Sequence, residues 1–290
     1  MTERIPVFIN PSAGNADDVT AALERDGSFD IREVEPDALQ EAVRAAVRDG
    51  AARVAVAGGD GTVASAATAL SELRAELAIL PAGTLNHFAK DSGIPEKPEE
   101  AVALARGGGT RRADTAYVNN RLFLNTSSVG LYVAFVRSRE RLERYLGYRL
   151  ASFVAAIRVF LGAHHVVVTL EIEGKKSTYR TPLVFVGVGE RELKLPTLGG
   201  RVDGGQSSLH VIVVRGRTRA GLAALAFAAA ARGVKHLART PHLDSFLVDT
   251  CSIDLRGPSG NVAVDGETVR MKTPLDYRIS REELTIVAPG

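Results

Sequence analysis

The sequence predicts an α/β N-terminal domain with a parallel sheet, followed by a β-rich C-terminal domain. Short apolar runs alternate with helical patterns in the first part of the chain, whereas the remainder contains many short apolar runs and only two long helical stretches. With 290 residues, of which 45% are hydrophobic, the chain is long enough to form two domains.

The first predicted strand covers residues 6–10 and runs into the turn Asn10-Pro11-Ser12-Ala13-Gly14, whose small and polar residues can serve a ligand. A helix is predicted next, and Gly50 is placed to end it. The apolar residues that define this helix are Leu39, Ala42, Val43, Ala46 and Val47.

Alternating Val and Ala residues at 54–57, after Arg53, predict a buried strand that ends in the turn Gly58-Gly59-Asp60-Gly61-Thr62. A helical pattern resumes at Val63. Glycines let the backbone approach a ligand closely, and the free N–H groups at a helix start attract anions, so the turn is interpreted as a phosphate-binding loop. An ordinary tight turn is the alternative. Because a carboxylate repels phosphate, Asp60 is expected to bind a metal ion, brace the loop, or meet a hydroxyl or amine.

A second ligand-binding turn is predicted at residues 81–90, after a buried strand at 77–80. Thr84 and Asn86 offer hydrogen-bonding side chains there, although an Asx turn or helix cap is the alternative for Asn10 and Asn86. All three turns follow strands of one parallel sheet, where ligands gather at the carboxyl ends. The predicted first domain is therefore Rossmann-like.

A glycine-rich stretch, Arg106–Thr110, marks the predicted boundary between an α/β domain at 1–110 and a β-sandwich domain at 111–290, whose last strand could return to the first domain. Helices are expected at 136–161 and 218–237. The strands expected in the second domain are 123–127, 166–172, 183–188, 209–214, 252–255, 261–264 and 284–287.

The composition argues against a nucleic-acid-binding, a disulfide-bonded or a membrane-spanning protein. The net charge of +2 is too balanced to indicate a nucleic-acid partner. The one cysteine, Cys251, cannot form an intramolecular disulfide, and we interpret it as a packing residue in a reducing compartment. With no signal peptide and no apolar run long enough to span a bilayer, we expect a cytoplasmic protein.

Five motifs follow one another in an order that resembles the diacylglycerol kinase catalytic family, especially its soluble bacterial lipid kinases. These are relatives of sphingosine kinases and, more distantly, of NAD kinases. The motifs are residues 10–14, 58–62, 81–89, 202–204 and 264–267. The resemblance implies transfer of the γ-phosphoryl group of ATP to a hydroxyl of diacylglycerol or a related lipid alcohol.

The resemblance also implies an ATP site in the cleft between the domains. We expect Asp60 to help hold the catalytic Mg²⁺, directly or through water, with loop bracing as the alternative. The residues expected to line the nucleotide site are Asn10, Gly58, Gly59, Asp60, Gly61, Thr62, Thr84 and Asn86.

Asp265 and Glu267 are expected to carry the acceptor chemistry. They lie two apart on a predicted strand, so both carboxylates should project from one face, with Gly266 leaving room for a hydroxyl. The resemblance implies that Glu267 is the general base and that Asp265 orients it or assists the metal; the roles could be exchanged. An Asp-Gly hairpin turn is the alternative.

A structural Mg²⁺ is also implied, bound by Asp203 and the carbonyls of Gly200 and Gly205. The chain departs from the family pattern there by one extra residue, so the ion could be absent. It departs again at the charged residues 189–194, and near Glu35 it has no threonine for the nucleotide.

Two other functions stay open. An NAD kinase should carry an Asn-Glu or Asn-Asp pair after the second turn, where this chain has Asn86-His87. A regulatory nucleotide-binding module without catalysis is the second rival. Arginines within 137–149 suit either an anionic lipid surface or a solvated helix face, so a peripheral position at the inner membrane surface stays open. The oligomeric state does not follow from the sequence.

Overall fold

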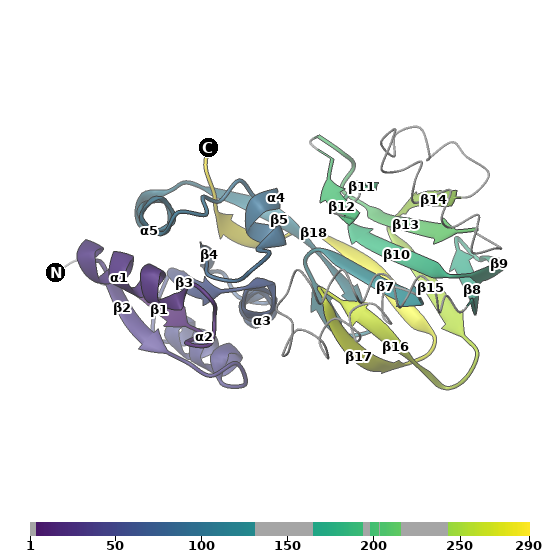
Figure 1. Cartoon of the computed structure of the whole chain (residues 1–290), viewed down its shortest axis with the longest axis horizontal. Helices are drawn as coiled ribbons and strands as arrows, with labels where there is room; N and C mark the ends of the chain where they lie inside the picture. The colour runs from purple at the N-terminus through teal and green to yellow at the C-terminus, as the bar shows by residue number, and fades with distance from the viewer. Residues whose placement is uncertain (1–3, 131–164, 194–197, 203, 216–242) are drawn as a thin grey trace. The chain divides into compact units, whose positions relative to one another are not determined.

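The computed structural model describes residues 4–130, 165–193, 198–202, 204–215 and 243–290 (Figure 1). The helices predicted at 136–161 and 218–237 lie outside these residues. The chain divides into two compact units, of which the first comprises Met1–Thr115 with Ser280–Gly290 and the second Ala116–Ile279.

The first unit is built on a parallel sheet in the order β2-β1-β3-β4-β18. Its strands are β1 (Ile5–Ile9), β2 (Phe29–Glu33), β3 (Arg53–Gly58), β4 (Glu76–Pro81) and the end of β18 (Leu275–Val287). Its helices are α1 (Ala16–Asp26), α2 (Leu39–Arg48), α3 (Asp60–Leu70), α4 (His87–Asp91) and α5 (Pro98–Gly107).

Helices cover the parallel sheet in two pairs, because α1 contacts α5 and α2 contacts α3 (Figure 1). Residues Ala55 and Ala57 of β3 share a buried core with α1 and α5. Val54 and Val56 alternate with them and are also fully buried, as expected for a central strand with both faces covered. Val63, Ala66, Ala67 and Leu70 form the buried, apolar face of α3.

The second unit contains an antiparallel sheet in the order β14-β13-β10-β7-β16-β17. Its strands are β7 (Thr126–Gly130), β10 (Leu183–Val188), β13 (Leu209–Val214), β14 (Leu243–Val248), β16 (Ser259–Val264) and β17 (Glu267–Lys272).

A further group of paired strands faces the same core. It consists of β5 (Thr110–Val118), β6 (Arg121–Phe123), β8 (Val166–Ile172), β9 (Lys175–Thr181), β15 (Thr250–Leu255) and the start of β18, while β11 (Arg191–Leu193) pairs with β12 (Leu198–Arg201). The core takes Val129 and Val186 from one sheet and Leu170, Ile253 and Tyr277 from the other. The structure therefore confirms an α/β first part and a β-rich second part.

The strand predicted at 123–127 is wrong as a single element. β6 ends at Phe123 and β7 begins at Thr126. Leu124 and Asn125 lie between them because their N–H groups donate to a side chain instead of to a neighbouring strand. That side chain belongs to Asp265.

Candidate functional site

The first predicted phosphate turn lies between β3 and α3. Gly58 ends the strand, Gly59 precedes the helix, and Asp60, Gly61 and Thr62 form the first helical turn. A Cβ atom on Gly58 would lie 2.3 Å from Oγ1 of Thr62, so only glycine fits beneath that side chain. The free N–H groups of a helix start are therefore present in this motif, as the sequence predicts.

The second glycine turn, after β4, packs against the first. A Cβ atom on Gly83 would lie 2.4 Å from the Cα atom of Gly59. In addition, the N–H of Ala82 donates to the carbonyl of Gly58 (3.0 Å). The two motifs therefore meet backbone to backbone at the carboxyl ends of adjacent parallel strands.

Asp60 links the two turns through its carboxylate. Oδ2 accepts a hydrogen bond from the N–H of His87 (3.1 Å), and Oδ1 accepts one from the N–H of Phe88 (3.0 Å). Asp60 thus satisfies the N-terminus of α4, which is the bracing role stated above as an alternative. Each carboxylate oxygen keeps acceptor capacity, so the magnesium role of Asp60 stays a prediction.

The two asparagines of the nucleotide motifs shape their own turns. Asn86 has a left-handed backbone (φ 50°); its Oδ1 accepts from Gly83 N (3.0 Å), and its Nδ2 donates to Gly83 O (2.8 Å). Oδ1 of Asn10 accepts from Ser12 N (3.0 Å). Both side chains make local contacts, whereas Thr84 is exposed.

Asp265 and Glu267 do not lie on one strand, so the same-face prediction is wrong. Asp265 (φ 45°) and Gly266 (φ 87°) form the two-residue turn of the β16–β17 hairpin, in which Val264 pairs with Glu267. Two positive φ angles at an Asp-Gly pair are typical of a type I′ turn, which reverses the chain between the two carboxylates.

The Asp265 carboxylate holds the segment between β6 and β7. Oδ2 accepts from Leu124 N (2.8 Å), and Oδ1 accepts from Asn125 N and Thr126 N (both 2.9 Å). The N–H of Asp265 donates to the carbonyl of Thr126 (2.8 Å). Asp265 therefore holds residues 124–126, between β6 and β7, through charge-assisted hydrogen bonds, which are stronger than neutral ones.

Glu267 is placed differently from Asp265. Its side chain is 58% exposed and forms an ion pair with Arg121 (2.8 Å), at the start of β6. The sequence analysis missed Arg121, because nothing local links it to a residue so distant in the chain. Of the two carboxylates, Glu267 is the one open to solvent.

The predicted structural magnesium site is only partly described. Gly200 lies in β12, and the N–H of Gly205 donates to the carbonyl of Val202 (3.0 Å), whereas Asp203 lies outside the described residues. Glu190, from the charged stretch that departs from the family pattern, accepts Gln206 N through Oε2 (3.2 Å). Across the described ranges, no three His, Cys, Asp or Glu side chains are grouped to hold a metal ion.

Two buried titratable groups lie outside these motifs. Nδ1 of His210 accepts from Arg191 N (2.9 Å), its Nε2 lies 2.7 Å from Oγ of Ser245, and burial lowers the pKa of the imidazole. Burial raises the pKa of the Cys251 thiol to about 12. Cys251 is therefore protonated at neutral pH, which agrees with its interpretation as a packing residue.

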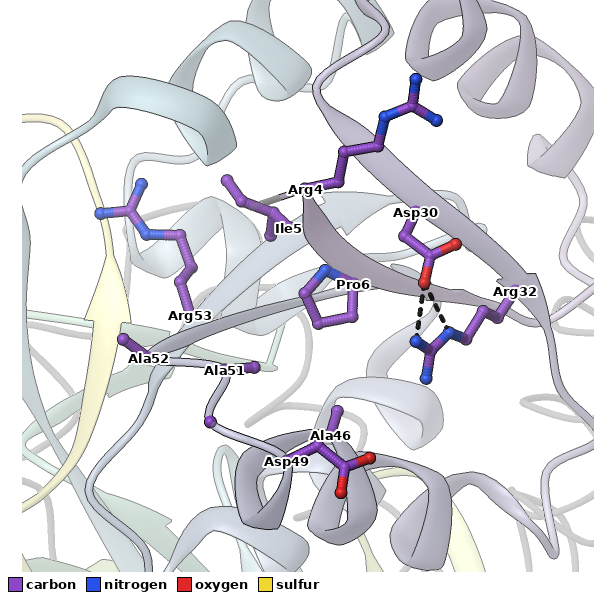
Figure 2. Close-up of a pocket in the computed structure, with 11 residues that line it drawn as sticks. Arg4, Ile5, Pro6, Asp30, Arg32, Ala46, Asp49, Ala51, Ala52 and Arg53 are labelled. Carbon is purple, nitrogen blue, oxygen red and sulfur yellow. Dashed lines mark hydrogen bonds and ion pairs between the residues drawn. The ribbon is translucent and has the colours of Figure 1, made fainter. Parts of the chain in front are cut away.

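A cavity of about 470 Å³ lies at the amino ends of β1 and β3, whereas the glycine turns follow the carboxyl ends of β3 and β4 (Figure 2). Arg4 and Arg53 line it, as does Arg32, which is paired with Asp30 (2.7 Å). The cavity contains none of the predicted site residues. No helix in the described part of the chain is long and apolar enough to cross a membrane.

Comparison with known proteins gives a family match. Residues 4–118 match the family described as "Diacylglycerol kinase catalytic domain". The chain is 36% identical over 122 residues to a Chromohalobacter salexigens protein and 31% identical over 171 residues to one from Pseudomonas putida, both named "Probable lipid kinase YegS-like". These matches cover 40% and 58% of this chain, but only 39% and 54% of the relatives. The resemblance predicted from the motifs is thus confirmed.

A solved structure supports the fold over nearly the whole chain. The "Crystal structure of a putative diacylglycerol kinase from Bacillus anthracis str. Sterne" has a TM-score of 0.75 at 23% identity, covering 99% of this chain and 97% of that one. At this identity the likeness establishes the fold: a mixed α/β sheet with a β-rich C-terminal part.

Proposed function

Because residues 4–118 match the diacylglycerol kinase catalytic domain, we propose that this chain is an ATP-dependent lipid kinase. It transfers the γ-phosphoryl group of ATP to a hydroxyl of diacylglycerol or a related lipid alcohol. The observation that carries the proposal is the contact between the Gly59 and Gly83 turns beside the start of α3. Close-packed backbone next to a helix N-terminus suits phosphate binding.

Each nucleotide residue has a role in this proposal. N–H groups at the start of α3 and the Thr62 hydroxyl bind phosphate oxygens, and Thr84 adds an exposed hydroxyl. Asn10 and Asn86 act by holding the shapes of their turns, as their local hydrogen bonds indicate. Gly58, Gly59 and Gly61 have no side chains that would keep a phosphate group from the backbone N–H groups.

A bound Mg²⁺ would supply positive charge that offsets the negative charge of the phosphates in phosphoryl transfer. Asp60 is the proposed ligand, directly or through water. Asp60→Asn keeps one carbonyl oxygen for the partly buried N–H of Phe88, leaves the exposed N–H of His87 to water and removes the charge. Turnover should therefore be lost, with a fall in melting temperature that reflects only the weakened bond to Phe88. If activity falls merely in proportion to the folded fraction, Asp60 serves only to brace the turn.

On the acceptor side, Glu267 is the proposed general base and Asp265 the residue that positions it. The exposure of Glu267 favours this assignment, because a base must reach the acceptor hydroxyl. Glu267→Gln should lower kcat by about 10²–10⁴-fold and leave the urea unfolding midpoint unchanged. Unchanged kcat would exclude Glu267 as the base.

The proposal includes a structural Mg²⁺ at Asp203, Gly200 and Gly205. Metal analysis of the purified protein and of Asp203→Ala tests this site. We expect one equivalent of magnesium in the unchanged chain and none in the variant.

The proposal also includes the domain arrangement predicted from the sequence. It has a Rossmann-like domain at 1–110 and a β-sandwich domain at 111–290, with the last strand returning to the first domain. A lipid acceptor further places this cytoplasmic enzyme at a membrane surface, which sedimentation with anionic liposomes tests.

The decisive experiment is transfer of radiolabelled phosphate from ATP into a total lipid extract, with Glu267→Gln as the control variant. A labelled lipid that the control does not produce supports the proposal and identifies the acceptor. ATP binding without transfer would favour a regulatory module. Efficient conversion of NAD to NADP in a parallel incubation would favour an NAD kinase.

A further inference from the structure

Asn125 has a buried amide oxygen without a hydrogen-bond partner. The residue lies between β6 and β7 and is only 6% exposed, yet its Oδ1 bonds to nothing in the described part of the chain. The side chain of nearby Ser127, by contrast, lies 3.0 Å from the Tyr277 hydroxyl in a hydrogen bond. Leaving a buried acceptor unpaired is costly in free energy, so such groups are rare and call for an explanation.

The backbone of Asn125 is held from two sides. Its N–H donates to Oδ1 of Asp265 (2.9 Å), and its carbonyl accepts from Val188 N (3.0 Å). With both main-chain groups held, the direction in which the side chain leaves the backbone is set before any ligand arrives. Such preorganisation lowers the entropic cost of binding.

Asn125 also belongs to the acceptor corner of the second unit. The hairpin tip that binds Asn125 through Asp265 continues directly into Glu267, and Glu267 pairs with Arg121, four residues before Asn125. The preceding residues, Phe123 and Leu124, are buried and apolar. A polar acceptor atom that follows two apolar residues, in a segment tied to the hairpin of the proposed base, suits a ligand that combines a hydroxyl with hydrocarbon.

We propose that Oδ1 of Asn125 accepts a hydrogen bond from a hydroxyl of the lipid acceptor and so selects alcohols over lipids without a free hydroxyl. This inference rests on the proposed lipid kinase function and adds a binding residue to it. Asp265 then has a double effect, because one carboxylate positions both the acceptor-binding residue and the base.

Asn125→Leu tests the proposal, since leucine has nearly the same shape but cannot hydrogen-bond. The KM for the acceptor should rise about tenfold while the KM for ATP is unchanged, which corresponds to one lost hydrogen bond. Melting temperature should not fall, because no hydrogen bond within the protein is removed. Ser128→Ala is the matched control: it also removes a buried, unpartnered oxygen, from β7, and should leave both KM values unchanged.

An unchanged acceptor KM in Asn125→Leu overturns the proposal. So does a fall in melting temperature with both KM values affected, because that result indicates that Asn125 binds a structural water. If the unchanged protein labels no lipid at all, the proposed lipid kinase function fails. The role of Asn125 is then tested separately, by measuring whether a lipid alcohol binds to its side chain.

Binding is read from the side-chain NH₂ resonance of Asn125, assigned by its disappearance in Asn125→Leu. The probe is the lipid labelled in the extract assay, or dioctanoylglycerol if none is labelled. A shift of this resonance on titration, absent with a matched diacyl ester that has no hydroxyl, supports the proposal. No shift, or an equal shift with both lipids, refutes it.

Discussion

Asp265→Asn should loosen the segment between β6 and β7 while leaving the hairpin turn intact. Asparagine tolerates the left-handed backbone that Asp265 adopts (φ 45°), so the substitution isolates the carboxylate from the turn. The carboxylate accepts three backbone N–H groups, at 2.8 Å from Leu124 and 2.9 Å from Asn125 and Thr126.

The expected cost follows from these three bonds. Asparagine keeps one oxygen for Asn125 and Thr126, but those two bonds lose charge assistance, at about 1 kcal/mol each. The N–H of Leu124 then faces an amide NH₂, and an unpaired buried donor costs about 1–3 kcal/mol. Because Asp265 is only partly buried, the lower end applies, and we expect a loss of about 3 kcal/mol.

Amide hydrogen exchange measures this loss at the residues concerned. Three kcal/mol corresponds to about a hundredfold faster exchange at Leu124, Asn125 and Thr126. Glu267→Gln is the control and should leave the exchange of these amides unchanged, because the Glu267–Arg121 pair is exposed. Exchange rates within twofold of the unchanged chain in Asp265→Asn would refute the reasoning.

Three further predictions concern other parts of the structure. Gly83→Ala places a Cβ atom 2.4 Å from Gly59 Cα and should cost about 1–3 kcal/mol of stability and weaken ATP binding, whereas Gly107→Ala, with open space around it, should do neither; equal stabilities would contradict the packing of the turns. Burial lowers the pKa of His210, so below its ordinary value of 6.5 the unfolded chain takes up a proton that the folded chain does not, and stability should fall as pH drops below 6.5. Urea titrations between pH 5 and 8 check this, and a slope equally steep in His210→Gln would exclude His210 as its origin. Cys251, with its pKa raised to about 12, should resist iodoacetamide at pH 8 in the native protein and react after unfolding; rapid native alkylation would show that the thiol is accessible.

The sequence predicted strands well where they are apolar and have a neighbouring strand on each side. β8, β10 and β13 begin and end as expected, because their apolar runs coincide with central positions in the sheets. The strands it missed include β2, β9, β14 and β17, which are the edge strands of the two large sheets. An edge strand needs fewer apolar residues, and β9, with the sequence KKSTYRT, gives almost no hydrophobic signal.

The site was predictable as a set of motifs but not as a set of contacts. Glycine turns can be recognised from the local sequence, because a backbone that packs closely against another backbone has no room for side chains. The partners of Asp60 and Asp265 lie 27 to 28 and 139 to 141 residues away, respectively, and nothing near either residue identifies them. The unpaired oxygen of Asn125 is likewise visible only once burial is known.

The last strand of the chain has a consequence for how this protein is made. Thr285 and Ile286 of β18 pair with Glu76 and Leu77 of β4, so the parallel sheet of the first unit contains residues from both ends of the sequence. During translation, β4 leaves the ribosome long before its neighbour and must wait with an open edge until residues 285 and 286 have been made. A gene fragment ending near Thr115 would encode a first unit without its fifth strand, and such a fragment should aggregate through that edge. When the first unit is produced alone, residues 280–290 therefore need to be joined back to it by a linker.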